Sequence, residues 1–519
     1  MCEAQEGGCG GGGQPRRSPR GSRPLRCMKC KEGSPVLIIR VGDAFCKTCF
    51  KEYFVHKFRA LLGKNRCIYP GEKVLLAYSG GPASSSMVRQ VLEGLSREAA
   101  KKLRFVPGII FIDEGAVCGQ SPDKRKEIRG QVEAILQATG FPYHLVCLEE
   151  VFDLPGSVLR SLSHDATDQG HSYKEAVDSF IRRQRQQGEE TGDLAGTLKD
   201  RVAELSLQDS SRKEGLAVQG AGPPPSSHTE ELVRLFAAVK TLTAKEELLQ
   251  TLRNHLILHV ARTSGYAKVM MGDSCTRVAV KLLTNLCLGR GAFLAVDTGF
   301  ADSRHGDVLF LRPMREYPAK EIAFYNHLFG VPTVFTPALD TKAPGRASIH
   351  HLIESFLCQL QSEFPSTIST VYRTGEKLGV TPREAGGSGG PAGLAQCLLC
   401  LCTLDTNVVD GSALQSTLLS EQLSRKPPSA GNGCCGGARD QTGCCKGPPA
   451  TGDSSGRSQL LALLCHGCRL TVRDMSSLEP LPPYIHSEAE RRRCRAAMKQ
   501  EIQEFLLEDD PELTAETPP

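Results

Sequence analysis

Short apolar runs alternate with helical apolar periods along the middle of the chain. Runs rich in Val, Leu, Ile and Phe predict strands at residues 73–79, 105–115, 143–148, 266–272 and 307–314. Apolar residues at helical spacing predict helices that begin near Ser84 and that cover 124–140, 229–265, 277–289 and 319–330. Because strands and helices alternate, we expect an α/β fold: a parallel sheet with helices on both faces.

Segments of different composition flank and interrupt this region. The α/β domain is predicted at 68–345, and its polar stretch 155–227 predicts a flexible insertion. The predicted flanking segments are a Gly/Pro/Arg-rich disordered start at 1–24, a cysteine module and helix at 25–62, a C-terminal helix and cysteine module at 346–475 with a Cys/Gly-rich loop at 425–457, and a charged helix with an acidic tail at 476–519. We therefore expect one α/β domain between two small cysteine modules.

The composition of the 519 residues is that of an ordinary soluble protein, with 40% hydrophobic and 23% charged residues and a net charge of +5. Such a weak charge permits a nucleic-acid partner without arguing for one. No apolar run is long enough to cross a bilayer, so no membrane partner is expected, and the first residues lack the apolar core of a secretory signal. We expect a cytosolic, reducing environment, in which the 22 cysteines bind metal or act in catalysis more often than they form disulfides.

Two CxxC pairs near the N-terminus have the spacing of a metal site. Each pair can place two thiolates on one ion, and the apolar residues 36–45 between them have the length of a hairpin that would bring the pairs together. The predicted ligands of a structural zinc ion are Cys27, Cys30, Cys46 and Cys49. Free cysteines in a small core are the alternative, and His56 is expected to pack without binding metal.

A second set of CxxC pairs predicts another structural zinc site, with Cys397, Cys400, Cys465 and Cys468 as its ligands. The connecting chain is longer than in the first module, but loop closure grows only logarithmically with length and costs about one kcal/mol more. Cys402 is an alternative ligand to Cys400. We expect unstructured thiols in the Gly/Pro-rich loop at Cys434, Cys435, Cys444 and Cys445.

The sequence "YSGGPASSS" resembles a phosphate-binding loop between a strand and a helix. The backbone N–H groups of Ser79, Gly80 and Gly81, together with the helix N-terminus, can hold an anion. The motif alone is weak, because many strand–helix turns contain it. Pro82 and Ala83 follow where an ATP-binding loop of this shape would carry a charge.

Several histidines and arginines are open to a structural as well as a functional interpretation. His255 and His259 share a helix face, but no carboxylate stands at the spacing of a zinc hydrolase, so packing is the better explanation. Basic stretches at 16–26, 123–129 and 491–495 are candidate contacts for RNA phosphates. Solvated helix faces and flexible arms explain such charge runs more often than not.

In their order, these motifs resemble the ATP-pyrophosphatase (PP-loop) family, and within it the tRNA 2-thiolation enzymes. Those proteins carry an N-terminal zinc module, SGGxDS after the first strand, IDEG after the second, GHNxDDxxE after a later strand, and a C-terminal zinc module. This chain has Cys27 to Cys49, "SGGPAS", "IDEG", "GDSCTRVAV" and Cys397 to Cys468, in that order. The resemblance spans residues 25–475 apart from the insertion. It implies a PP-loop-like sheet with a vestigial nucleotide site at Ser79, Gly80, Gly81, Ser84, Asp113 and Gly272.

The chain departs from this pattern at the reactive positions. Ala83 replaces the loop Asp, Thr276 and Arg277 replace the later acidic pair, and Val280 replaces the Glu. Without these carboxylates the chain lacks the usual ligands that hold Mg²⁺ against ATP phosphates, which argues against ATP binding. The catalytic cysteines are missing too, because residues 115–254 contain only Cys118 and Cys147 and no CxxC.

The resemblance therefore implies a non-catalytic subunit of a tRNA 2-thiolation enzyme, a heterodimer with a catalytic thiolase paralogue. The implied reaction places sulfur on the wobble uridine (5-methoxycarbonylmethyl-2-thiouridine) of cytosolic tRNA-Lys, tRNA-Glu and tRNA-Gln, with sulfur from a thiocarboxylated ubiquitin-related modifier. In one alternative the chain is itself an active adenylating enzyme, in which Ser84, Ser85, Asp113 and Glu114 replace the lost acids. In another it is a zinc-module nucleic-acid binder with no role in thiolation.

Overall fold

The computed structural model describes residues 26–39, 43–96, 102–160, 224–291, 294–339, 346–378, 396–404 and 454–502, with isolated residues between 173 and 182 and between 341 and 344. The described residues belong to two compact units, which meet in the sequence between Lys57 and Phe58. Several predicted segments lie outside the described residues: the start 1–24, most of the insertion, the acidic tail, and Cys434, Cys435, Cys444 and Cys445. The predicted domain boundaries stay predictions.

The first unit contains the expected hairpin. Strands β1 (Leu37–Ile38) and β2 (Ala44–Phe45) pair antiparallel, and helix α1 (Lys47–Asn65) begins directly after them. Phe45, Phe50 and Phe54 are buried and contribute large aromatic side chains to this small core.

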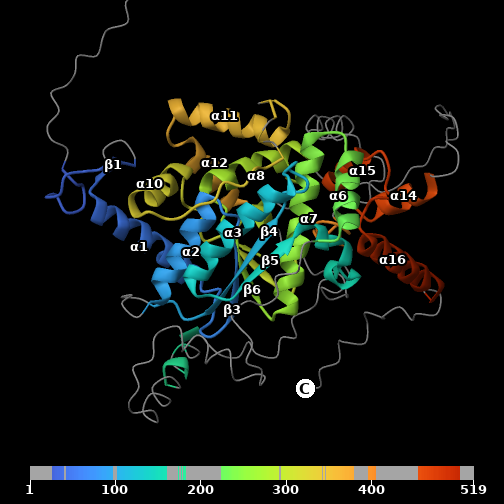
Figure 1. The fold of residues 1–519 in the computed structure, drawn as a ribbon, viewed down its shortest axis with the longest axis horizontal. Coiled ribbons are helices and arrows are strands. Elements are labelled where there is room, and N and C mark those ends of the chain that lie inside the picture. The colour runs from blue at the N-terminus through green and yellow to red at the C-terminus, as the bar shows by residue number, and fades with distance from the viewer. Residues whose placement is uncertain are drawn as a thin grey trace, which may run out of the picture. The chain divides into compact units, whose positions relative to one another are not determined.

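The second unit is built around a six-stranded sheet in the order β5-β4-β3-β6-β8-β7 (Figure 1). The parallel strands are β3 (Lys73–Ala77), β4 (Val106–Asp113), β5 (Tyr143–Cys147), β6 (Lys268–Met270) and β8 (Leu309–Leu311). The apolar runs thus predicted the parallel strands correctly. The edge strand β7 (Ala301–Asp302) pairs antiparallel with β8, and no apolar run announced it.

Helices cover both faces of this sheet, as expected. The helices of the α/β region are α2 (Pro82–Leu95), α3 (Pro122–Thr139), α6 (Ser226–Ala238), α7 (Leu242–Thr263), α8 (Cys275–Cys287), α9 (Leu294–Thr298) and α10 (Ala319–Phe329). Leu75 and Ile110 share a core with leucines of α6 and α7. Val74 and Leu76 are also fully buried, and because successive strand residues point to opposite faces, the other face is covered too.

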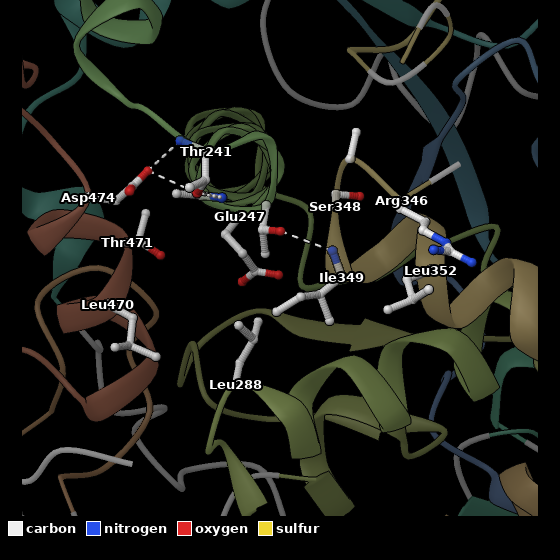
Figure 2. Close-up of a pocket in the computed structure, with 13 residues that line it drawn as sticks. Thr241, Glu247, Leu288, Arg346, Ser348, Ile349, Leu352, Leu470, Thr471 and Asp474 are labelled. Carbon is white, nitrogen blue, oxygen red and sulfur yellow. Dashed lines mark hydrogen bonds between the residues drawn. The ribbon is translucent and has the colours of Figure 1, made fainter. Parts of the chain in front are cut away.

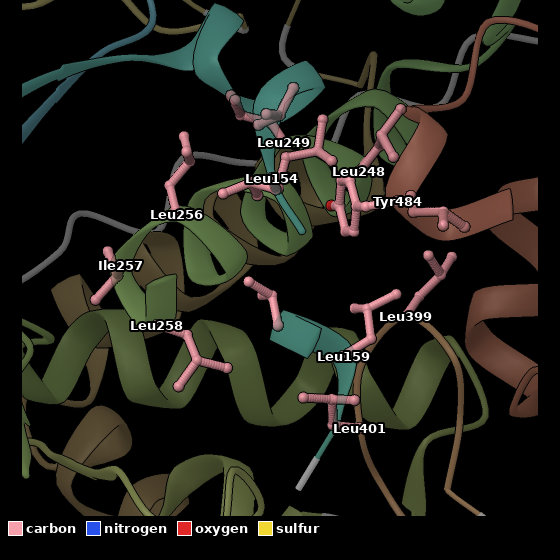
Figure 3. Close-up of a cluster of buried hydrophobic side chains, with 14 of the residues drawn as sticks. Leu154, Leu159, Leu248, Leu249, Leu256, Ile257, Leu258, Leu399, Leu401 and Tyr484 are labelled. Carbon is pink, nitrogen blue, oxygen red and sulfur yellow. The ribbon is translucent and has the colours of Figure 1, made fainter. Parts of the chain in front are cut away.

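The C-terminal elements share the core of the second unit. They are α11 (Ile349–Glu363), α12 (Thr367–Lys377), α14 (Ser454–Ala462), α15 (His466–Arg473) and α16 (Pro483–Ile502), and short 3-10 helices η1 (Leu148–Asp153) and η2 (Gly156–Leu159) lie against α16 and α7. Figure 3 shows Leu399, Leu401 and Tyr484 beside leucines of α7. Among the described helices, none has the length and apolar character to span a bilayer.

Candidate functional site

The loop between β3 and α2 lies where the strand order reverses. From β3 the chain continues to β4 on one side, whereas β6 and β8 add on the other side, and in open α/β sheets such a point is the usual ligand site. Gly81 is the N-cap of α2 and Pro82 is its first residue, where a missing N–H costs no helical hydrogen bond. The backbone thus keeps the shape of a phosphate-binding loop.

The loop makes several hydrogen bonds within the protein. Ser84 Oγ accepts a hydrogen bond from Ser79 N at 3.2 Å and donates to Gly81 O at 3.0 Å. Gly80 has φ +79°, and its carbonyl accepts from Val334 N at 2.9 Å. These hydrogen bonds connect the loop to Ser84 and to Val334, and they hold the start of α2 in place.

Gly272 packs against the start of α2. A Cβ atom at Gly272 would come within 3.0 Å of the backbone N and Cα of Ser84, so only glycine allows this close approach. The structure therefore brings together the predicted residues Ser79, Gly80, Gly81, Ser84 and Gly272.

The predicted Asp113 lies at the end of β4, and an arginine holds it. Arg125 Nε of α3 donates to Asp113 Oδ2 at 2.9 Å, and the two Nη groups of Arg125 donate to Glu149 at 2.6 and 3.1 Å. The Arg125 side chain is only 12% exposed and that of Glu149 is fully buried. This network fixes the strand end, and Asp113 shares the single positive charge of Arg125 with Glu149.

The neighbouring strand ends repeat this arrangement. Glu114 receives two hydrogen bonds from Arg253 of α7, one of them at 2.8 Å, and Asp273, just beyond β6, accepts from Arg312 Nε at 3.3 Å. Burial lowers the pKa of Arg253, but the charge of Glu114 and its hydrogen bond outweigh burial and raise that pKa above its usual value. Three carboxylates at the carboxyl edge of the sheet thus each face an arginine. The sequence showed the acids but gave no signal for these partners.

The substituted residues of the later motif also have structural roles. Thr276 Oγ1 accepts a hydrogen bond from Ala319 N at 3.2 Å, and Val280 is buried in the core of α8, α11 and α12. Arg277 is 63% exposed and lies 3.5 Å from Glu354. None of these three side chains supplies the carboxylate with which proteins usually hold Mg²⁺ beside substrate phosphates.

Both predicted cysteine groups come together. The ligand atoms of Cys27, Cys30, Cys46 and Cys49 lie within 4.8 Å of one another, and so do those of Cys397, Cys400, Cys465 and Cys468. The Sγ atoms of Cys30 and Cys46 are 3.9 Å apart, and those of Cys400 and Cys465 are 3.5 Å apart. Tetrahedral zinc with Zn–S bonds of about 2.3 Å places its sulfurs about 3.8 Å apart. Each group can therefore hold one metal ion.

The alternative ligands lie outside these groups. His56 and His259 belong to neither group, and Cys402 Sγ accepts a hydrogen bond from Arg304 at 3.2 Å. His255 is buried, and its ring nitrogens lie 2.7 Å from Tyr484 Oη and 2.8 Å from Leu399 O. His255 is therefore a packed histidine, as predicted, and it fixes the turn between Cys397 and Cys400.

Comparison with known proteins agrees with these features. A family model described as cytoplasmic tRNA 2-thiolation protein 2 matches residues 348–470. The protein of that name from Bos taurus is 54% identical over 98% of both chains, and the one from Homo sapiens is 53% identical over 96% of both. The chain belongs to this family. The solved U34-tRNA thiolase NcsA from Methanococcus maripaludis, with its 4Fe-4S cluster, has a TM-score of 0.41 and 14% identity, and the match covers 68% of this chain and 87% of that one.

Residues 348–470, which match the family model, contribute part of the lining of a cavity of about 370 Å³ between α7, α11 and α15 (Figure 2). Glu247 points into it and is held by Arg290 and by His350 Nε2 at 2.8 Å. Asp474 accepts two hydrogen bonds from Thr241, at 2.6 and 2.9 Å, next to the N-terminus of α7. Leu352 and Leu470 line the same cavity and are 49% and 38% exposed.

Some arginines of the predicted basic stretches form hydrogen bonds within the fold. Arg125 serves the sheet edge, and Arg492 donates to Gln396 O and Leu159 O at 2.6 and 2.8 Å. These two arginines are committed to the fold, so they are not candidate phosphate contacts, whereas the other basic residues of 123–129 and 491–495 stay candidates. The stretch 16–26 lies outside the described residues except for Arg26.

Proposed function

We propose that this chain is a non-catalytic subunit of a cytoplasmic tRNA 2-thiolation complex. Its relatives are named for cytoplasmic tRNA 2-thiolation. The observation that carries the non-catalytic role is the pairing of Asp113, Glu114 and Asp273 with arginines at the carboxyl edge of the sheet. ATP adenylation needs carboxylates that hold Mg²⁺ against the phosphates, and these carboxylates already carry a cation.

The thiols near the sheet support the same conclusion. Sulfur transfer requires a thiolate, because the thiol form is a poor nucleophile. Burial raises the pKa of Cys147 to about 11, so this group stays protonated at neutral pH. The reactive sulfur chemistry then belongs to a partner.

The proposed partner is a catalytic thiolase paralogue, which forms a heterodimer with this chain. The complex modifies the wobble uridine of cytosolic tRNA-Lys, tRNA-Glu and tRNA-Gln, and it takes sulfur from a thiocarboxylated ubiquitin-related modifier. The resemblance of the ordered motifs and the names of the relatives support this assignment. In it, the chain stabilises the catalytic subunit and contributes to the tRNA-binding surface.

Zinc is the proposed metal at both cysteine groups. Four thiolates with sulfur separations near 3.8 Å suit a closed structural site, which leaves no open position for substrate. One ion would join the hairpin to α1, and the other would join the turn at residues 397–400 to α15.

The test is genetic complementation in cells that lack the protein. Wobble 2-thiouridine, measured by mass spectrometry of digested tRNA, should disappear in these cells and return with the wild-type chain. Asp113→Asn should restore it equally well, since the side chain has no catalytic role and the amide keeps the shape. Loss of modification with a folded Asp113→Asn chain, or ATP/pyrophosphate exchange by the purified chain alone, would instead indicate an active enzyme.

A further inference from the structure

The first half of α16 carries an unusual concentration of positive charge around one carboxylate. Glu488 is fully buried and accepts hydrogen bonds from Arg491 at 2.7 and 2.5 Å, from Arg492 at 3.1 Å and from Arg160 at 3.1 Å. Arg160 directly follows η2, and its approach to α16 could not be inferred from the sequence. One negative charge therefore holds three guanidinium groups.

Glu488 has no capacity for further donors. A carboxylate offers about four acceptor positions, and the four bonds described above use them all. Burial raises the pKa of Glu488, but the hydrogen bonds from Arg491, Arg492 and Arg160 outweigh burial and hold the pKa below its usual value. The group thus stays ionised at neutral pH and positions the arginines without neutralising them.

The arginines differ in how much of the guanidinium is left for another molecule. Arg492 is 18% exposed and gives its Nη groups to two backbone carbonyls. Arg160 and Arg491 are 44% and 37% exposed, and on Glu488 they use one and two of their five N–H donors respectively. Arg495 lies one turn after Arg491 on the same side of the helix and is exposed.

We propose that Arg160, Arg491 and Arg495 form a surface that binds the phosphate backbone of tRNA. This inference rests on the proposed function. Arginine suits phosphate because its planar donors match the phosphate oxygens, and a carboxylate that fixes the arginines lowers the entropy lost on binding. In Figure 1, α16 runs outward from the region of α6 and α7.

The contacts are to phosphates and not to bases. Electrostatic contacts to a polyanion release counterions, so the affinity falls with salt by a slope that counts the contacts. Base recognition in RNA mostly stacks unpaired bases on aromatic side chains or guanidinium planes, and the hydrogen bonds to Glu488 fix the planes of Arg160 and Arg491 for another use. It therefore supplies affinity and orientation, and the choice of tRNA lies elsewhere in the complex.

The experiment measures binding of a tRNA-Lys transcript to the full chain across a series of salt concentrations. Arg491→Ala/Arg495→Ala should weaken binding about tenfold at low salt and reduce the slope of log affinity against log salt by about 1.5, as expected for two lost phosphate contacts. Arg493→Ala is the matched control, because Arg493 pairs with Glu490 on another side of the helix. Thermal melts of all variants confirm folding, and Arg495→Ala alone, which removes no contact to Glu488, should show about half of the effect on the slope.

A variant of Met498 distinguishes an RNA ligand from a protein partner, because an exposed apolar side chain contributes to protein contacts and not to phosphate contacts. This side chain is 65% exposed further along the same helix. Met498→Ser should leave tRNA binding unchanged. Wild-type-like affinity and slope in both arginine variants would overturn the assignment of the surface while leaving the proposed function intact. A wild-type chain that fails to bind tRNA, both alone and with its thiolase partner, would count against this surface and against the proposed function. If the arginine variants keep tRNA binding but lose binding to anionic lipid vesicles, the surface binds a membrane and not tRNA.

Discussion

At the scale of single residues, Arg125 stabilises the sheet edge more than any exposed arginine can. Arg125→Ala leaves the fully buried Glu149 without its bidentate partner, and breaking such a pair costs about 3–5 kcal/mol. Arg277→Ala, at a residue that is 63% exposed, should cost less than about 0.5 kcal/mol. Urea denaturation of the two variants measures the difference. Equal midpoints would show that the network at Asp113 contributes little to folding.

A single carboxylate also sets part of the acid sensitivity. Burial raises the pKa of Glu247, but the charge of Arg290 and the hydrogen bond from His350 outweigh burial and lower the pKa to about 2. Because the folded pKa lies below the unfolded value near 4.5, Glu247 stabilises the fold above pH 4.5 and loses this effect as the pH falls toward 2. The contribution is up to about 3 kcal/mol. Unfolding free energies of Glu247→Gln and wild type, measured from pH 7 down to the lowest pH at which both stay folded, should converge.

Gly272 is a residue whose role depends on space alone. Gly272→Ala would push a methyl group against the backbone of Ser84, so we expect a loss of about 1–3 kcal/mol from overpacking at the start of α2. Gly130→Ala on α3 is the matched control, because a Cβ there meets nothing within 4 Å. That substitution should be neutral or stabilising in a thermal melt. Similar melting temperatures for the two variants would contradict the close approach of Gly272 to α2.

At the scale of elements, the sequence predicted the parallel strands and the cysteine groups because each carries a local signal. The residues of one apolar run lie within a few positions of each other in the chain, and so do the two cysteines of one CxxC pair. The sequence did not predict β7, because this strand is two residues long and one of them is Asp302. The sequence did not predict the arginine partners of Asp113 and Glu114. They come from α3 and α7, and only the folded chain brings them to the strand ends.

The second cysteine group should control the order of the elements around it. Removing its metal, by chelation or by Cys465→Ser, leaves the turn at 397–400 and α15 connected mainly through His255 and the leucine core. Amide hydrogen exchange in α15 and residues 396–404 should rise at least tenfold, whereas β3 and β4 should keep their protection. Cys358→Ser, at an exposed position on α11, is the matched control. Unchanged exchange after verified metal loss would show that the apolar core alone orders these elements.

At the scale of the whole molecule, the proposed loss of catalysis involves more than a few missing acids. Ala83→Asp with Arg277→Asp would return carboxylates to two positions where the resemblance implies them. The remaining acids would still face Arg125, Arg253 and Arg312. The loop would still be hydrogen-bonded to Ser84 and Val334. We therefore expect no ATP/pyrophosphate exchange from this double variant, in an assay where an active PP-loop enzyme serves as the positive control. Measurable exchange would show that the arginine pairs yield to Mg²⁺ and ATP. Two restored carboxylates would then be enough for adenylation, although the cysteines needed for sulfur transfer would still be missing.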